Sequence, residues 1–264
     1  MDYRGKIIWI TGAASGIGKA LATEFSKKAA TVILSDRDIK NLDEVAQACK
    51  NLGGKVVTAP FDLEKPDEIH DAVAKVLKSH PKIDLLFSNG GISQRSYAID
   101  TPVGIDRKIM EINFFGAVVL TKELLPSLIS GTGGKIVITS SAVGKFGFPL
   151  RTAYCASKHA LQGYFEALRA ELYDKNVKVT IVSPGRVFTN ISVNAIDQKG
   201  KKYGKMDEGQ KKGIPASTCA KRIIRAVEKN KKELWLGGPV ILMIYIRLYL
   251  PFLFHKLAPR IKPT

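Results

Sequence analysis

Short apolar runs alternate with helical patterns along most of the chain, and this alternation allows only a few folds. The runs are continuous stretches rich in Val, Ile and Leu, as in strands that are buried on both faces of a parallel sheet. Between the runs, apolar residues recur three and four positions apart, as from Ile39 to Leu42 and Val45, which predicts amphipathic helices. Strands are therefore expected at residues 6–10, 31–35, 55–59, 83–87, 135–139 and 177–182.

This order of strands and helices predicts a doubly wound, Rossmann-like α/β fold, with about seven parallel strands and helices on both faces of the sheet. The 264 residues, 45% of them hydrophobic, can bury a large core, and no linker or repeat divides them. We therefore expect a single domain over residues 1–264. Ligands of such sheets bind at the carboxyl ends of the strands, so the polar residues that follow each strand are the candidate functional residues.

A glycine-rich stretch follows the first predicted strand and opens the first predicted helix. Gly12 permits a tight turn, Gly16 allows the backbone to approach a pyrophosphate, and Gly18 allows the helix to pack closely on the strand. The free N–H groups and the positive dipole end of the helix would attract the phosphates. A structural loop is the alternative, but the strand–loop–helix context predicts a dinucleotide site. The full stretch is Thr11-Gly12-Ala13-Ala14-Ser15-Gly16-Ile17-Gly18.

The second predicted strand is followed by an acid and a base, Asp36 and Arg37. Asp36 lies 18 residues beyond Gly18, where a carboxylate can accept hydrogen bonds from both ribose hydroxyls and would repel a 2′-phosphate. The guanidinium of Arg37 could clamp that phosphate, or it could be solvated. Because Asp36 occupies the ribose position itself, NAD(H) is favoured as the cofactor, with NADP(H) as the alternative.

A tyrosine and a lysine are separated by one helical turn in the segment Tyr154-Cys155-Ala156-Ser157-Lys158. A free tyrosine, with a pKa of about 10, is a poor base at neutral pH. An ammonium one turn away would favour the phenolate, and the hydroxyl could then exchange a proton with an alcohol or a carbonyl. The spacing alone is weak evidence, because an ordinary helix face can also show it.

Polar and glycine clusters at other predicted strand ends strengthen this interpretation. Asn113 is a further polar residue in an otherwise apolar helical run, where its side chain would compete with backbone hydrogen bonding and needs a partner. Together these residues predict one site at the carboxyl edge of the sheet. The clusters are Ser88-Asn89-Gly90-Gly91, Ser140-Ser141 and Ser183-Pro184-Gly185.

In these motifs the chain resembles the short-chain dehydrogenase/reductase family over residues 6–227. Besides the glycine-rich loop, Asp62 and the segments 89–91 and 184–189 are similar to the family's cofactor motifs. Ser88 and Gly90 depart from the family's Asn-Asn-Ala-Gly, whereas Asn89 and Gly91 are kept. The resemblance implies cofactor binding by Gly12, Ser15, Gly16, Ile17, Gly18, Asp36, Arg37, Asp62, Leu63, Asn89, Gly90, Gly91, Tyr154, Lys158, Pro184, Gly185, Val187 and Thr189.

The resemblance also implies a catalytic tetrad of Asn113, Ser141, Tyr154 and Lys158. Tyr154 would be the general acid and base, and Lys158 would lower its pKa and hold the nicotinamide ribose. Ser141, rather than Ser140, would hydrogen-bond the reacting oxygen, and Asn113 would support a water relay to Lys158. The expected reaction is hydride transfer between the nicotinamide and a substrate carbon. The alternative is a catalytically weak, NAD(P)-sensing binding protein, which would be expected to lose Tyr154 or Lys158.

The segment 188–213 is polar and rich in lysine and glycine, and we expect it to form a mobile lid. The substrate pocket beneath it is expected to be apolar and partly aromatic. Such a pocket favours a hydrophobic secondary alcohol or ketone of steroid, lipid or xenobiotic type. Its predicted lining is Val143, Phe146, Phe148, Phe188, Ile191 and residues 93–97.

The net charge and the cysteine content limit which macromolecules and metal ions the chain is expected to bind. The formal net charge is +17, and a solvated lysine-rich surface explains it as well as attraction to an anionic surface does. No recognised module predicts nucleic-acid binding. The three cysteines lack metal-ligand spacing, so no metal site is predicted and a reducing compartment is indicated. Because no leader pattern precedes the first strand, a cytoplasmic location is expected, with peripheral membrane contact as the alternative.

The C-terminal extension, residues 238–264, carries an apolar stretch over residues 240–254 that Arg247 and Pro251 interrupt. The stretch is too short to span a bilayer. It could be a core helix or the seam of a homodimer or homotetramer, or it could be a helix that dips into a membrane surface. We favour the protein seam because the two residues break the apolar face.

Overall fold

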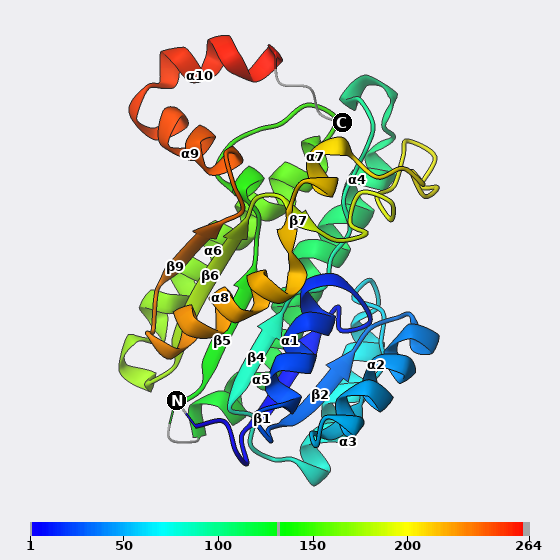
Figure 1. The fold of residues 1–264 in the computed structure, drawn as a ribbon, viewed down its shortest axis with the longest axis vertical. Coiled ribbons are helices and arrows are strands. Elements are labelled where there is room, and N and C mark those ends of the chain that lie inside the picture. Colours follow the sequence, from blue (N-terminus) through cyan, green and yellow to red (C-terminus); the bar gives the residue numbers. More distant parts are fainter. Residues whose placement is uncertain (1, 131–132, 261–264) are drawn as a thin grey trace.

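The computed structural model describes residues 2–130 and 133–260. Its main sheet has seven parallel strands in the order β3-β2-β1-β4-β5-β6-β9 (Figure 1), which confirms the predicted doubly wound fold. The order reverses between β1 and β4, the place where such sheets bind ligands. The strands are β1 (Ile7–Thr11), β2 (Thr31–Ser35), β3 (Lys55–Thr58), β4 (Leu85–Ser88), β5 (Lys135–Thr139), β6 (Lys178–Pro184) and β9 (Glu233–Leu236), with β7 (Val187–Phe188) and β8 (Ile214–Pro215) paired separately.

The six strands expected from the sequence are all present, and each bound lies within two residues of its prediction. The seventh, β9, had no predicted range. It lies at the sheet edge beside β6, and three of its four residues are only partly buried. An edge strand with the sequence Glu-Leu-Trp-Leu lacks the continuous apolar run that marks the inner strands.

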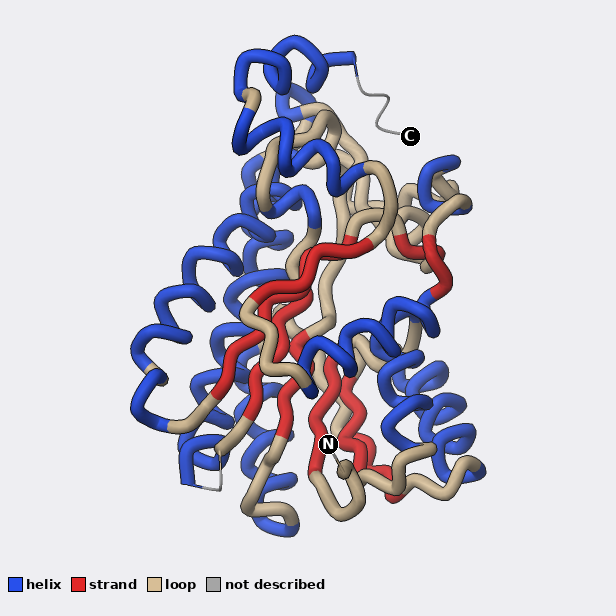
Figure 2. The backbone as a smooth tube through the Cα atoms, turned by 60° about the vertical axis from the view of Figure 1, so that its left-hand side comes forward, coloured by secondary structure: helices blue, strands red, loops and turns tan. Residues whose placement is uncertain are grey.

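Helices cover both faces of the sheet (Figure 2). One hydrophobic cluster joins α3, α4, α5 and α6 to one face, and a second joins α1, α2 and α8 to the other. The helices are α1 (Gly16–Ser26), α2 (Ile39–Asn51), α3 (Pro66–Ser79), α4 (Val103–Met110), α5 (Gly116–Ser130), α6 (Thr152–Glu171), α7 (Glu208–Lys211), α8 (Ala216–Glu228), α9 (Val240–Tyr249) and α10 (Pro251–Leu257).

The run from α4 to α5, residues 103–130, is long and apolar enough to cross a membrane by length and composition alone. Half of its most apolar window is buried in the protein, where Ile109, Leu120 and Leu124 belong to the cluster on the sheet. The run is therefore accounted for as a core helix of the α/β fold.

The C-terminal helices α9 and α10 lie beyond the carboxyl edge of the sheet, away from the two main helix layers (Figure 1). Ile244 and Phe254 are buried there against Phe146 and Val143, which lie between β5 and α6. This third cluster brings the start of the extension next to the candidate site. The extension was predicted to run over residues 238–264, and its last four residues lie outside the described part.

Candidate active site

The loop between β1 and α1 meets the loop after β4 backbone to backbone. Gly12 and Gly16 have φ angles of +64° and +54°, in the left-handed region that favours glycine. A Cβ atom at Gly12 would lie 2.8 Å from the Cα atom of Gly90, and one at Gly18 would collide with the Gly12 carbonyl. The cradle at the N-terminus of α1 is therefore made of bare backbone, which fits the pyrophosphate of a dinucleotide.

A groove over the carboxyl ends of β1, β4, β5 and β6 gathers most of the predicted cofactor residues. Its lining is Gly12, Ser15, Gly16, Ile17, Asn89, Gly91, Thr139, Ser140, Ser141, Tyr154, Lys158, Pro184, Gly185, Val187, Thr189, Asn190, Ile191, Asn194 and Gln210. The predicted site residues outside this lining are Gly18, Asp36, Arg37, Asp62, Leu63, Gly90 and Asn113. Gly18 and Gly90 serve the close backbone approach, and the charged residues follow β2 and β3 along the same sheet edge.

The two charged residues after β2 have different partners. The carboxylate of Asp36 accepts hydrogen bonds from the backbone N–H groups of Ala14 and Asp38, each at 3.1 Å. The guanidinium of Arg37 forms an ion pair with Asp62 at 3.5 Å. Asp62 therefore competes with any 2′-phosphate for Arg37, whereas Asp36 is tied directly to the glycine-rich loop.

The two serines after β5 have separate roles. Ser140 is buried, donates a hydrogen bond to the Lys158 carbonyl oxygen at 2.9 Å, and accepts one from the Gln162 amide at 3.0 Å. It therefore joins β5 to α6. The hydroxyl of Ser141 lies 3.4 Å from the Pro184 carbonyl oxygen and forms a hydrogen bond with Tyr154. This placement agrees with the choice of Ser141 as the serine that meets a substrate.

Tyr154 and Lys158 project from the start of α6 into the groove. Burial raises the pKa of Tyr154, while the hydrogen bond with Ser141 and the charges of Arg151 and Arg95 act in the opposite direction. Burial lowers the pKa of Lys158 to about 8, and its ammonium donates to the last carbonyl of β5 at 2.9 Å. The causes of this shift in the pKa of Tyr154 do not include Lys158, so the implied role of Lys158 in lowering that pKa stays a prediction.

Asn113 lies in a π-helical turn, η2 (Glu111–Phe115), between α4 and α5. Its Oδ1 accepts a hydrogen bond from the Ile92 N–H at 2.8 Å, and its Nδ2 donates to the Ile92 carbonyl at 2.9 Å and to Ser157 Oγ at 3.0 Å. The side chain thus links the loop after β4 to α6. These contacts are the hydrogen-bond partners that a polar residue in an apolar helical run was expected to need. Its implied water relay to Lys158 stays a prediction.

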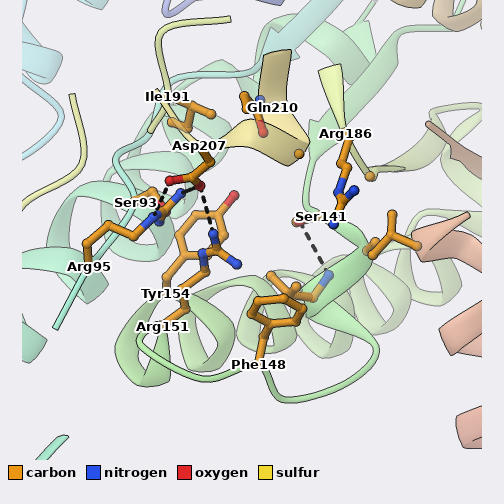
Figure 3. Close-up of a pocket in the computed structure, with 15 residues that line it drawn as sticks. Ser93, Arg95, Ser141, Phe148, Arg151, Tyr154, Arg186, Ile191, Asp207 and Gln210 are labelled. Atoms are coloured by element: carbon orange, nitrogen blue, oxygen red, sulfur yellow. Dashed lines mark hydrogen bonds and ion pairs between the residues drawn. The ribbon is translucent and has the colours of Figure 1, made fainter. Parts of the chain in front are cut away.

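A second pocket adjoins the cofactor groove, and Ser141, Tyr154, Gly185, Ile191 and Gln210 line both. The two spaces therefore meet at the predicted reacting groups. The full lining of this second pocket (Figure 3), the candidate substrate pocket, is Ser93, Arg95, Ser141, Ala142, Val143, Phe148, Arg151, Tyr154, Gly185, Arg186, Ile191, Asp207, Gly209, Gln210 and Val240.

The segment 188–213 contributes residues to this pocket, as predicted. Backbone hydrogen bonds join it to the loop after β4. Ile196 accepts a backbone hydrogen bond from Arg95 and donates one to Ser93, each at 2.9 Å. The predicted lining is correct for Val143, Phe148, Ile191, Ser93 and Arg95. It is wrong for Phe188, which is 54% exposed, for Phe146, which is buried beneath α9, and for Gln94, Ser96 and Tyr97, which do not line the pocket.

A buried ionic cluster occupies one wall of the pocket, so the prediction of an apolar pocket is wrong in this respect. Asp207, just before α7, forms ion pairs with Arg95 at 2.5 Å and with Arg151 at 2.9 Å (Figure 3). The side chains of Arg95 and Asp207 are only 3% and 6% exposed. The three residues are far apart in the sequence, and no spacing rule could have joined them.

Gln94, which the sequence analysis assigned only to the pocket lining, has a different role in the structure. It is fully buried in the loop after β4, and its side-chain oxygen faces the N-terminus of α6, whose first turn contains Ala153 and Tyr154. Its amide nitrogen donates to Ser96 Oγ at 3.1 Å. A buried glutamine next to an ionic cluster gives no sequence signal by itself, since its partners lie about 60 residues away.

Proteins with this fold include enzymes and binding proteins, and a comparison with known protein families shows to which family this chain belongs. The model described as short chain dehydrogenase matches residues 6–200. The chain belongs to the short-chain dehydrogenase/reductase family. It is therefore an NAD(P)-dependent oxidoreductase, as the resemblance implied.

Similar proteins extend over nearly the whole chain. "Dehydrogenase/reductase SDR family member 7B" of Mus musculus is 41% identical over 259 residues, which cover 96% of this chain and 80% of the mouse protein. "Dehydrogenase/reductase SDR family protein 7-like" of Drosophila melanogaster is 38% identical over 255 residues, with 95% and 78% coverage.

Solved structures show the same fold. A short-chain dehydrogenase/reductase from Burkholderia phymatum in complex with NAD has a TM-score of 0.84 at 21% identity and covers 100% of this chain and 98% of its own. An alcohol dehydrogenase from Thermococcus sibiricus complexed with 5-hydroxy-NADP has a TM-score of 0.76 at 23% identity, with 90% and 98% coverage.

Proposed function

We propose that the chain transfers a hydride between a nicotinamide cofactor and a secondary alcohol or ketone with a hydrophobic part, of steroid, lipid or xenobiotic type. One observation carries the proposal: Ser141 and Tyr154 line both the cofactor groove and the substrate pocket. A substrate carbon that reaches these hydroxyls lies at the junction of the two spaces. The nicotinamide, when bound, supplies or accepts the hydride there.

The side chains at this junction can handle the proton. Because burial raises its pKa, Tyr154 is protonated at neutral pH and can donate its proton to a carbonyl oxygen during reduction. The Ser141 hydroxyl is placed to hydrogen-bond the same oxygen. In the oxidation direction Tyr154 must first lose its proton, so oxidation is favoured by higher pH.

For the cofactor, we propose a preference for NAD(H) over NADP(H). Two contacts support it: the glycine-rich loop holds Asp36, the residue predicted to meet the ribose, through the Ala14 N–H, and Asp62 pairs with Arg37. A carboxylate at that position repels a 2′-phosphate. The alternative role, a weak NAD(P)-sensing binding protein, gains no support, because Tyr154 and Lys158 are both present in the groove.

The direct experiment is a screen of alcohols and ketones with both cofactors, with nicotinamide absorbance as the readout. We expect reduction of hydrophobic ketones with NADH. A protein that binds the cofactor but turns over none of these compounds would contradict the proposed reaction and favour the binding-protein role.

We also propose that helices α9 and α10 form a seam with a second copy of the chain in the cytoplasm. The support is an apolar surface that these helices expose, with Leu248 at 59%, Tyr249 at 75% and Phe252 at 84% exposure. Contiguous apolar surface of this kind marks an interaction site in soluble proteins. Arg247 stacks near Phe254 at 5.7 Å and interrupts that surface, which suits a protein partner better than a lipid interior. Peripheral membrane contact is the rival interpretation.

A further inference from the structure

The substrate pocket contains more positive than negative charge. Arg95, Arg151 and Arg186 line it together with one acidic residue, Asp207. Arg95 and Asp207 form a buried pair, and Arg151 shares the same carboxylate. Asp207 already pairs with Arg95 and Arg151, so no acidic residue of the lining is left to balance the charge of Arg186.

Arg186 differs from the other two arginines in its surroundings. It follows β6 between Gly185 and Val187, and its side chain is exposed. Its guanidinium forms no hydrogen bond or ion pair with any residue in the ranges 2–130 and 133–260. Figure 3 shows it beside Ser141, across the pocket from the Arg95–Asp207 pair.

The lid leaves room for this guanidinium. A Cβ atom at Gly209 would lie 2.6 Å from Cζ of Arg186, so any side chain at that position would displace it. The backbone N–H of Arg186 is fixed by the Gly237 carbonyl oxygen at 3.1 Å, which anchors the base of the side chain. An anchored arginine with unused donors is well suited to bind a planar or tetrahedral oxyanion.

We propose that Arg186 binds an anionic group, a carboxylate or a phosphate monoester, that the substrate carries near its reacting carbonyl. This inference rests on the proposed function, because it assigns a substrate feature to the same pocket. The apolar remainder of the substrate packs on Phe148, Ile191 and Val240, which line the pocket as well. The substrate is therefore amphipathic rather than wholly hydrophobic.

The test compares substrates that differ only in charge. One pair is 4-oxododecanoate and its methyl ester, and the other is the phosphate monoester of 1-hydroxydodecan-2-one and the free alcohol. We expect kcat/KM to be about tenfold or more higher for at least one anion than for its neutral partner, because a charge-assisted hydrogen bond is lost in the neutral compound. The pair with the larger ratio identifies the anion.

Three variants locate the effect. Arg186→Gln should lower the anion-to-neutral ratio about tenfold, and Arg186→Lys should retain part of it. Arg4→Gln removes an exposed arginine at the N-terminus and should leave the ratio unchanged. In a Tyr154→Phe background, calorimetric Kd values for the acid and the ester should show the same dependence on Arg186 without turnover.

The outcomes separate the inference from the function on which it rests. Turnover of neutral ketones with no preference for either anion overturns the inference and leaves the proposed function intact. Turnover of neither class contradicts the proposed function itself. If Arg186→Gln weakens cofactor binding about tenfold while the substrate ratio stays unchanged, Arg186 serves the cofactor and the inference is wrong.

Discussion

The side-chain oxygen of Gln94 accepts a hydrogen bond from the backbone N–H of Tyr154 at 3.4 Å, and one from Ala153 at 3.0 Å. These N–H groups belong to the first turn of α6, which has no partners within the helix. Arg151, the residue at the N-cap position, makes no side-chain cap of its own. The loop after β4 therefore caps the helix that carries Tyr154 and fixes the height of its hydroxyl in the pocket.

The first prediction tests this cap. Gln94→Ala should lower the free energy of unfolding by about 1–2 kcal/mol, because two buried N–H groups lose their acceptor. It should also lower kcat more than it raises KM. Thr152→Ala, which removes only a 3.5 Å contact to the same amide, is the matched control. Equal losses of kcat in both variants would mean that the cap does not position Tyr154.

The second prediction concerns the proton donor. Tyr154→Phe removes one hydroxyl and should lower kcat for ketone reduction by about 10²–10⁴-fold, with the Kd of NADH nearly unchanged. Wild-type oxidation of the alcohol should rise with pH while reduction does not, because the pKa of Tyr154 is raised. Near-normal turnover by the variant would refute its role as acid and base.

The third prediction concerns the buried lysine. The pKa of Lys158 falls from 10.5 to about 8 on folding, so the folded state binds this proton more weakly than the unfolded state does. Wild-type stability should therefore rise as pH increases from about 8 to about 10.5. Lys158→Met should abolish that rise and be more stable at pH 7, by about 1–3 kcal/mol, although inactive.

Denaturant unfolding of both proteins at pH 7 and pH 10 is the measurement for Lys158. Lys40→Met, at an exposed position, is the control and should keep the wild-type pH profile. A Lys158→Met protein that is less stable than wild type at pH 7 would show that the ammonium contributes more through its hydrogen bond to Thr139 than it costs by burial.

The fourth prediction concerns cofactor choice. Asp36→Ala should move the preference toward NADP(H), and it should weaken both cofactors because the Ala14 N–H loses its acceptor. Asp62→Ala leaves Asp36 in place and frees Arg37, but it also removes a residue that is implied to bind the cofactor, so it should weaken NAD(H) binding and shift the preference toward NADP(H). The measurement is the Kd of each protein for NADH and NADPH, obtained by fluorescence titration. A wild type that already binds NADPH about tenfold more tightly than NADH contradicts the proposed preference.

The fifth prediction concerns the α9–α10 surface. Leu248→Gln combined with Phe252→Gln removes exposed apolar area, and should halve the mass in solution if the surface joins two copies, since each buried side chain contributes about 1.5–3 kcal/mol. Lys256→Gln is the polar control. Salt-sensitive sedimentation with anionic vesicles, at unchanged mass, would favour the membrane instead.

The sequence predicted the fold well because its strongest signals are local. Continuous apolar runs identified the inner strands, and Gly12, Gly16 and Gly18, in their strand–loop–helix context, identified the tight backbone loop between β1 and α1. The tyrosine and the lysine of α6 could be found in the same way, since one helical turn fixes their relation. These features depend on neighbours within a few residues.

The features that the sequence could not predict are contacts between distant segments. The pairing of Asp207 with Arg95 and Arg151 joins three segments, and the cap by Gln94 joins two. From the sequence alone, Arg95 and Arg151 would be expected on a solvated surface. Their position in a pocket follows from the tertiary fold. The raised pKa of Tyr154 likewise follows from burial, which depends on the tertiary fold rather than on the helical spacing.

The position of Val240 at the substrate pocket has an evolutionary consequence. The hydride-transfer machinery is encoded before residue 190, whereas the lid from Ile191 to Gln210 and the start of α9 supply much of the pocket wall. A chimera that exchanges residues 191–264 with those of a relative should inherit the part of the donor's substrate preference that this wall sets, and keep the recipient's cofactor together with the anion preference assigned to Arg186. The part of substrate choice that this segment sets can therefore diversify as an exchangeable module, without alteration of the chemistry to which it is attached.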